Sequence, residues 1–508
     1  MKSKFLFFLV SALATLTTAY QTKAQEFQAR QPVVRQARPA YRLIDLGTFG
    51  GPNSQFATAP TSNVLTLFGN AVGAADTSTA NPYGVMDNPY LLSDQNTEHA
   101  FYRCYGGLMD LGTLPNGASS FADWINQSNQ IVGFSENGEI DPISGFPEII
   151  AVLWRNDKIA SLGTLGGNHS LANSINDRGQ IVGAALNATP DDFSLLGLGT
   201  ETRAFLWQSG KMSDLGTLGG ADAFAFFIND KSQIAGFSST NSTPVDATGL
   251  PTIDPFVWQN GRMTDLGSLG GNLGQPFAMN DFGTIVGYSD IAGDQDFHPF
   301  LWNGTKMMDL GTLGGSDGEA NAVNDLGEVV GDADTTGGAD HAFLWMNGKM
   351  HDLLTIGSDA CSIANSINLL GQIVGDSGDC SASDHAFLSQ NGGPMMNLDS
   401  LVVQNHTLTV TSAVFIDDLG EIACRGALPN GDQHACLLVP VLASGKRNEP
   451  LTAQADAPLQ PEVSSLRAGT ANTTTPNLRL GDGMRKRARG LRMARWLRLR
   501  NTTTPARP

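Results

Sequence analysis

Residues 341–350 read HAFLWMNGKM, an apolar segment and an Asn-Gly turn, and they begin the fullest copy of a repeated pattern. The complete pattern runs in the order apolar strand, Asn-Gly turn, Asp-Leu-Gly, Gly-Gly, Ile-Asn-Asp and Ile-Val-Gly. Its Asp-Leu-Gly element, altered in the third, seventh and eighth copies, starts at Asp45, Asp110, Ser161, Asp214, Asp265, Asp309, Asp352 and Asn397. These starts are 43 to 65 residues apart, while the spacing inside a unit stays nearly constant, which is typical of a repeat protein.

Each unit reads as four short strands joined by tight turns. A turn-forming asparagine recurs at Asn126, Asn176, Asn229, Asn280, Asn324 and Asn368, and a glycine follows each of them by seven residues. Asn-Asp and Asn-Gly pairs favour tight turns and hairpins, and no unit has the period of a helix. Four antiparallel strands at this spacing predict the blades of a β-propeller, which is an all-β fold.

The two ends of the repeat array predict how the ring closes. Seven blades are complete, which leaves one strand at 41–48 and three strands at 411–440. Pairing of the N-terminal strand with the last three makes an eighth blade and removes the exposed sheet edges. We therefore expect eight four-stranded blades, with seven as the alternative because the first and last units are degenerate.

The repeated motifs His-Ala-Phe-Leu-Trp, Asp-Leu-Gly-Thr-Leu-Gly-Gly and Ile-Asn-Asp-x-Gly-x-Ile-Val-Gly resemble those of the bacterial extracellular HAF-repeat family. The resemblance covers 41–441. In the second to fifth units the His-Ala pair is replaced, at Ala151, Arg203-Ala204, Asp254-Pro255 and His298-Pro299. The resemblance implies export and repeat identity, and it supplies no catalytic residue.

Charge and composition divide the chain into unlike parts. The 508 residues carry a formal net charge of −18, but the segment 485–500 holds eight cations and no acid, and without it 23 cations face 49 acids. Lys2 and Lys4 precede an apolar run of about twelve residues, which is typical of an export signal and too short to span a bilayer. We predict a signal peptide at 1–24, a linker at 25–40, the propeller at 41–441, a disordered linker at 442–483 and a basic tail at 484–508.

Four of the five cysteines are placed as two pairs. Cys361 and Cys380 are symmetric about one predicted hairpin turn, and Cys424 and Cys436 about another. Cross-strand neighbours lie close enough for a disulfide, and an exported protein allows one. We expect both disulfides, with four free thiols as the alternative, and we expect Cys104 to be buried in its strand.

Recurring polar and aromatic residues are expected to have structural roles. The histidines His99, His298, His341, His385 and His434 take the same position in different blades, which separates them too widely to share a metal ion. Inter-blade hydrogen bonding is the better explanation for them. The repeated Asp and Asn residues are expected in turns and inter-blade bonds, and the tryptophans Trp154, Trp207, Trp258, Trp302 and Trp345 in the core.

The connections from the Ile-Val-Gly strand to the next strand vary in length and are rich in acids. Variable loops on a rigid scaffold are where binding usually resides. Carboxylates at alternate positions can ligate Ca²⁺, although no segment matches a complete calcium loop. The candidate ligands are Asp290, Asp294, Asp296, Asp332, Asp334 and Asp340, with a solvated acidic face as the alternative.

The leading interpretation is a secreted or periplasmic propeller that binds a ligand, protein or glycan through its variable-loop face. One alternative is a polysaccharide hydrolase or lyase with carboxylates at the mouth of the ring, and another is a structural surface protein held by its basic tail. No catalytic residue or cofactor is assigned, apart from the candidate Ca²⁺. The acidic propeller argues against nucleic acid as a partner. A monomer is expected. Residues 484–500 are a candidate contact with an anionic surface.

Overall fold

The computed structural model describes residues 38–57, 62–83, 96–104, 107–191, 194, 198–245, 251–380 and 382–441. The chain divides into a unit of Met1–Ala40 and a unit of Tyr41–Pro508, and the strands of the described residues belong to the second. The predicted signal peptide 1–24, the linker 442–483 and the tail 484–508 lie outside the described residues, as does most of the linker 25–40.

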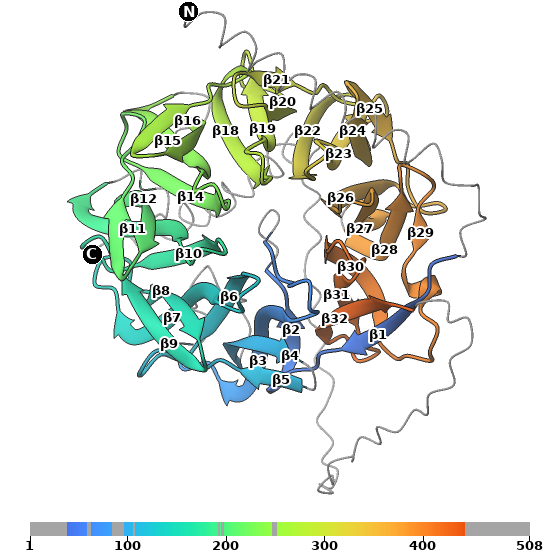
Figure 1. Cartoon of the computed structure of the whole chain (residues 1–508), viewed down its shortest axis with the longest axis horizontal. Coiled ribbons are helices and arrows are strands. Elements are labelled where there is room, and N and C mark those ends of the chain that lie inside the picture. The colour runs from blue at the N-terminus through green and yellow to red at the C-terminus, as the bar shows by residue number, and fades with distance from the viewer. Residues whose placement is uncertain are drawn as a thin grey trace, which may run out of the picture. The chain divides into compact units, whose positions relative to one another are not determined.

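Seven groups of four consecutive strands form antiparallel blades, which we number 1 to 7 (Figure 1). Blades 1 to 4 contain β2 (Gly50–Gln55), β3 (Ala71–Ala80), β4 (Asn96–Cys104), β5 (Gly107–Asp110); β6 (Ser120–Ile125), β7 (Ile131–Ile140), β8 (Pro147–Arg155), β9 (Lys158–Gly163); β10 (Ser170–Ile175), β11 (Ile181–Pro190), β12 (Thr200–Gln208), β13 (Lys211–Asp214); β14 (Ala223–Ile228), β15 (Ile234–Pro244), β16 (Pro251–Gln259) and β17 (Arg262–Asp265). Blades 5 to 7 contain β18 (Gly270–Met279), β19 (Ile285–Ile291), β20 (Phe297–Trp302), β21 (Met307–Asp309); β22 (Gly314–Val323), β23 (Val329–Thr335), β24 (Asp340–Met346), β25 (Lys349–Asp352); β26 (Cys361–Ile367), β27 (Gln372–Asp379), β28 (Ala382–Gln390) and β29 (Met396–Asn397). A single parallel pair, Ile253 with Leu273, links blades 4 and 5.

Blade 8 joins the two ends of the second unit. It consists of β30 (Thr409–Ile416), β31 (Ile422–Ala427) and β32 (Gln433–Pro440), completed by β1 (Tyr41–Asp45). Strand β1 runs antiparallel to β32, in a register that pairs Tyr41 with Pro440 and Asp45 with Cys436. The prediction of eight blades, with the N-terminal strand in the last one, is therefore confirmed.

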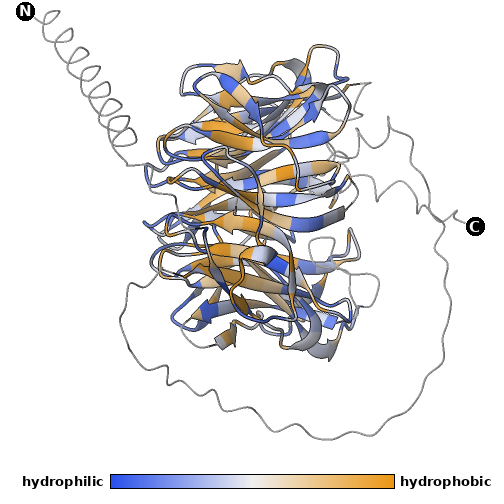
Figure 2. Cartoon of the chain, turned by 90° about the vertical axis from the view of Figure 1, so that its right-hand side faces the viewer, coloured by the Kyte–Doolittle hydropathy of each residue, from blue (hydrophilic) through white to orange (hydrophobic). Residues whose placement is uncertain are grey.

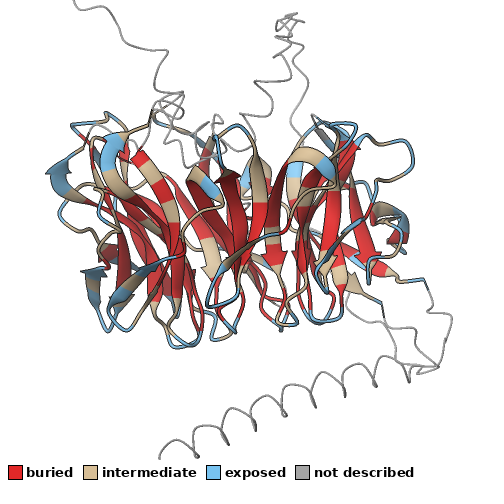
Figure 3. Cartoon of the chain, turned by 90° about the horizontal axis from the view of Figure 1, so that it is seen from above, coloured by how far each residue is buried: buried red, intermediate tan, exposed pale blue. Residues whose placement is uncertain are grey.

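The first strand of each blade lies toward the centre of the ring and the fourth lies at its outer edge (Figure 1). The strands run between two faces of the ring, and exposed residues gather in the connections at both faces (Figure 3). Hydrophobic residues follow the strands, whereas the connections are mostly hydrophilic (Figure 2). In the part of the chain that the structure describes, no helix is long and apolar enough to cross a membrane.

The hydrophobic core lies between neighbouring blades rather than at one centre. For example, Val72 and Ala100 of blade 1 pack with Ile125 and Val152 of blade 2 in one cluster. A fully buried phenylalanine recurs in the third strand, at Phe101, Phe205, Phe256, Phe300, Phe343 and Phe387. Since each blade buries its faces against two neighbours, a closed ring removes apolar surface from water at every blade.

Candidate functional site

A belt of asparagine side chains joins the blades on the face of the ring that carries the tight turns. Each Asn side-chain amide donates to the main-chain carbonyl of the corresponding residue in the next blade. These bonds run Asn126 to Asn176 (2.9 Å), Asn176 to Asn229 (3.0 Å), Asn229 to Asn280 (3.4 Å), Asn280 to Asn324 (3.0 Å), Asn324 to Asn368 (3.1 Å) and Asn368 to Asp417 (2.8 Å). The predicted inter-blade role of these residues is confirmed.

Asp417 takes the place of the asparagine in blade 8. Its carboxylate accepts the backbone N–H of Leu419 and Glu421, as the asparagine oxygens do in their own turns. However, a carboxylate has no N–H to donate to the next blade, and among the described atoms Oδ2 of Asp417 has no hydrogen-bond partner although the residue is buried. Burial raises the pKa of Asp417 to about 6. In blade 1, Thr66 stands at the corresponding position and accepts the turn N–H groups. Because Asp417 has no donor, no side-chain bridge of this kind joins blades 8 and 1 among the described residues.

The variant Asp417→Asn is expected to raise the free energy of unfolding at pH 7.5 by about 1 kcal/mol. A folded-state pKa above the unfolded value makes the native protein lose stability as pH rises from about 4 to 6, because the native state binds the extra proton. An asparagine does not titrate, so the variant keeps its stability as the pH rises. Urea unfolding should therefore show a higher free energy of unfolding for the variant than for the wild type at pH 7.5, and little difference at pH 4. The reciprocal Asn368→Asp variant should be less stable than the wild type at pH 7.5. If the free energy of unfolding depends on pH in the same way in the wild type and in Asp417→Asn, the explanation is contradicted.

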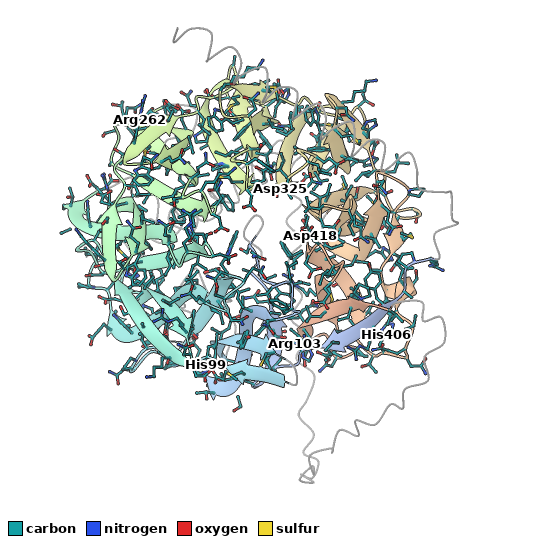
Figure 4. All side chains as sticks on the ribbon, in the orientation of Figure 1. His99, Arg103, Arg262, Asp325, His406 and Asp418 are labelled. Carbon is teal, nitrogen blue, oxygen red and sulfur yellow. A yellow bond between two sulfur atoms is a disulfide. The ribbon has the colours of Figure 1, made fainter. Side chains whose placement is uncertain are left out.

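An inner ring of carboxylates follows the belt, one residue further along the chain. Asp177, Asp230, Asp325 and Asp418 each accept a backbone N–H from the preceding blade at 2.8 to 3.1 Å. Figure 4 places Asp325 and Asp418 on the inner side of the ring. Burial, followed by the negative charges of Asp325 and Asp230, raises the pKa of Asp281 in the same ring. These acids therefore serve the inter-blade contacts and also place negative charge on the inner side of the ring.

The recurring histidines bond through Nδ1 to an aspartate within their own blades, which differs from the predicted inter-blade bonding. The prediction holds for His434, which also bonds the backbone of Pro52 in β2 of the neighbouring blade. Each Nδ1 lies 2.8 to 3.0 Å from an aspartate, and in four blades this is the Asp of the Asp-Leu-Gly element on the neighbouring fourth strand. The pairs are His99–Asp110, His298–Asp309, His341–Asp352 and His434–Asp45, whereas His385 pairs with Asp359. The aspartate also accepts the N–H of the residue two positions later, for example Gly112 at 2.7 Å, which forms the turn that ends the strand.

Blade 4 breaks this pairing because Asp254 stands where a histidine would. It faces Asp265, so burial and then the charge of Asp265 raise the pKa of Asp254 to about 6. The variant Asp254→His recreates the pair seen at His298 and Asp309, where a proline also follows the histidine. We expect it to raise the free energy of unfolding by about 1 kcal/mol at neutral pH.

Urea denaturation measures this effect, and Asp254→Asn is the matched control. The Asn variant removes the repulsion without adding an ion pair, so its gain should be the smaller of the two. A His variant no more stable than the Asn variant would show that the pair contributes nothing in blade 4.

The six candidate calcium ligands lie in two neighbouring blades and have other contacts. Asp294 accepts the backbone N–H and the side-chain amide of Asn272 at 2.7 and 2.6 Å. Asp332 accepts the side-chain amide of Asn321 at 3.1 Å, and Asp334 pairs with Asp340 across β23 and β24. Among the described residues, no group of three or more His, Cys, Asp or Glu side chains is arranged to hold a metal ion. Burial, and then the charge of Asp294, raises the pKa of Asp290 to about 7. The main-chain carbonyl of Asp296 accepts the N–H of Ile291 at 3.1 Å.

The structure contains the disulfides Cys361–Cys380 and Cys424–Cys436, the two pairs that the hairpin positions indicated. Cys424 and Cys436 are direct register partners. Cys361 instead pairs with Gly378 in the register, because a bulge between Ala364 and Ser366 shifts the strands. The free Cys104 is half-buried rather than buried as expected.

A cavity of about 640 Å³ lies between blades 2 and 3 on the tight-turn face. Arg155, Lys158 and Arg178 line it together with Trp207 and Gln130. Its lining contains no acidic side chain, and within the described residues none of the three cations forms an ion pair. The predicted packing role of the tryptophans holds for Trp207, whose half-buried ring packs against the core, but the same ring also borders this cavity.

A smaller cavity of about 200 Å³ between the same blades opens toward the variable connections. Asp141 borders it and accepts hydrogen bonds from Asn168 at 2.7 Å and from the backbone and hydroxyl of Ser144. Burial alone would raise the pKa of Asp141, but these hydrogen bonds lower it to about 2. The fully buried His169 places Nε2 3.4 Å from the same carboxylate. The carboxylate of Asp141 therefore stabilises its own loop through these hydrogen bonds.

No family model matches the chain, and no curated protein matches it. Among solved structures, a mutant of the Aleuria aurantia lectin in complex with Fucalpha1-6GlcNAc is 10% identical over 62% of this chain and 92% of the lectin, with a TM-score of 0.26. A mutant of AofleA from Arthrobotrys oligospora is 10% identical over 63% of this chain and 91% of that one, with a TM-score of 0.27. A Trypanosoma rangeli sialidase is 10% identical over 57% of each chain, also at 0.27. The strand order and the closure by β1 identify this chain as an eight-bladed β-propeller.

Proposed function

We propose that the protein is an exported binding scaffold whose ligand is an acidic saccharide, held in the cavity between blades 2 and 3. The observation that carries this proposal is the grouping of Arg155, Lys158 and Arg178 beside Trp207. Residues 41–441 hold 12 basic and 44 acidic residues, so three cations around one cavity stand out from their surroundings. Guanidinium groups bind carboxylates through paired hydrogen bonds, and a tryptophan ring offers an apolar surface to a sugar.

We further propose that the chain is exported by its first 24 residues, that its repeats are of the HAF type, and that the basic tail contacts an anionic surface. Two disulfides are consistent with an oxidising compartment outside the cytoplasm. Binding on the tight-turn face replaces the variable-loop face as the favoured location, because the larger cavity and its cations lie there.

The double variant Arg155→Ala with Arg178→Ala is expected to weaken binding of digalacturonate by about a hundredfold or more. Each substitution removes a charge-assisted hydrogen-bond donor from the cavity while leaving the strands intact. Isothermal titration of the full-length protein measures the effect, and the neutral galactose disaccharide of the same linkage should bind neither protein.

The control variant Arg42→Ala with Lys231→Ala removes two cations that line neither the cavity nor its surroundings and should bind digalacturonate like the wild type. If the cavity variant also binds like the wild type, the ligand does not sit between blades 2 and 3. If the wild type binds neither digalacturonate nor the equivalent sulfated disaccharides, the acidic-saccharide proposal fails.

A further inference from the structure

A basic residue recurs directly after the turn that leads into the fourth strand of five consecutive blades. The five residues are Lys158, Lys211, Arg262, Lys306 and Lys349, and all of them are exposed. Four begin their fourth strand, and Lys306 lies one residue before β21. Figure 4 shows Arg262 at the outer edge of the ring, whereas Asp325 and Asp418 lie on its inner side. The tight-turn face therefore has a cationic outer rim and an acidic centre.

This rim accounts for five of the 12 basic residues between 41 and 441. Among the described residues none of the five forms an ion pair, and none packs its charge against an aromatic ring as Lys231 does with Phe282. An exposed, unpaired lysine contributes little to stability. Packing therefore does not explain why the same charge returns at the same place in each blade.

The rim is continuous with the cavity between blades 2 and 3. Lys158 lines that cavity and is also the first member of the rim, and Lys211 begins the fourth strand of the next blade. Equivalent positions in neighbouring blades are on the order of 10 Å or more apart, so a monosaccharide cannot reach two of them. The carboxylates on the inner side of the ring repel an anionic chain from the centre and leave the circumference as its path.

We propose that the outer rim of blades 2 to 6 binds a linear polyanionic saccharide, a chain of uronic acids anchored by one unit in the cavity. The inference rests on the proposed function for its anchor and adds the polymer and its course around the ring. Once one unit of the saccharide chain is bound, the next cations contact the same chain at a high effective concentration. Each further contact therefore raises the affinity of the whole chain.

The test compares binding of a galacturonate disaccharide and dodecasaccharide to full-length protein. The rim variant combines Lys211→Ala, Arg262→Ala and Lys306→Ala and leaves the cavity untouched. A control variant with the same charge change combines Lys231→Ala, Gln295→Glu and Thr336→Glu away from the rim. Wild type and control should bind the dodecasaccharide at least about tenfold more tightly than the disaccharide, whereas the rim variant should keep its disaccharide affinity and lose most of the gain.

The possible results distinguish the rim proposal from the cavity proposal. A rim variant that keeps the gain with length would overturn the proposal, as would a wild type that binds both lengths equally. Disaccharide binding without a gain leaves the cavity proposal standing and removes the rim. Dodecasaccharide binding that depends on the rim, without disaccharide binding, supports the rim and rejects the cavity as the anchor. The basic tail is present in all three proteins and contributes equally to each comparison.

Discussion

Replacing Gly331 by alanine is expected to lower the free energy of unfolding by about 4 kcal/mol or more, or to prevent folding. A Cβ at this position would lie 1.9 Å from the carbonyl oxygen of Glu319 and 3.0 Å from Cα of Ala320. Both atoms belong to the backbone of β22, which pairs with β23 at this point through a bulge, so no side chain can turn aside to make room. Urea denaturation followed by circular dichroism measures the loss.

The matched control for this prediction is Gly337→Ala in the same blade. Gly337 is exposed in the connection between β23 and β24, and a Cβ there would meet only the Thr335 hydroxyl at 3.7 Å. That variant should stay within about 0.5 kcal/mol of wild type. A Gly331→Ala protein as stable as the Gly337→Ala protein would refute the steric argument.

The same contact explains the glycine of every Ile-Val-Gly element. A Cβ would lie 1.9 to 2.0 Å from a carbonyl oxygen of the first strand at Gly133, Gly183, Gly236, Gly287, Gly331 and Gly375. The first two strands of a blade approach closely where the first strand bulges, for example between Ala172 and Ser174. The glycine that marked the repeat in the sequence is therefore required by backbone contact.

The blade order and the closure of the ring could be predicted because they depend on local signals. Turn residues such as Asn324 and Gly327 define hairpins within a few residues, and the repeat period then multiplies one blade around the ring. The disulfide Cys424–Cys436 followed from the same hairpin geometry. Such features depend on residues that are close in the sequence and not on how distant blades pack.

The partner of each histidine and the basic cavity needed information beyond a single unit. Phe343 pairs with Asp352 in the register, which brings His341, two residues earlier, within 3.0 Å of the same aspartate. The spacing of eleven residues between His and Asp recurs in three blades, was visible in the sequence and could have suggested this pair. Arg155 and Arg178 come together only when blades 2 and 3 pack, and no repeated motif contains both.

Deleting the chain through Asp45 is expected to abolish the cooperative unfolding of the ring under conditions where the wild type is stable. Strand β1 buries Tyr41 and Leu43 in the core of blade 8, with 1% and 6% of their surfaces exposed. Its loss also removes the bond of Gln404 to the Leu43 carbonyl at 2.6 Å and the pair of Asp45 with His434 at 2.8 Å. The edge of β32 would then be open to pairing with other chains, so aggregation should accompany the loss of stability.

Adding a synthetic peptide of residues 38–45 should restore the folded ring, because the contacts of β1 with the rest of blade 8 are ones that a separate strand can make. Thermal unfolding and light scattering follow the rescue at increasing peptide concentration, which should raise the apparent stability by mass action. The same peptide carrying Leu43→Asp places a charge in the apolar core and should give no rescue. A truncated chain that unfolds at the wild-type temperature without peptide would mean that the other strands hold the ring closed unaided. In that case the cores between blades would carry the closure, and the division of one blade between the two ends of the repeat array would contribute little to stability.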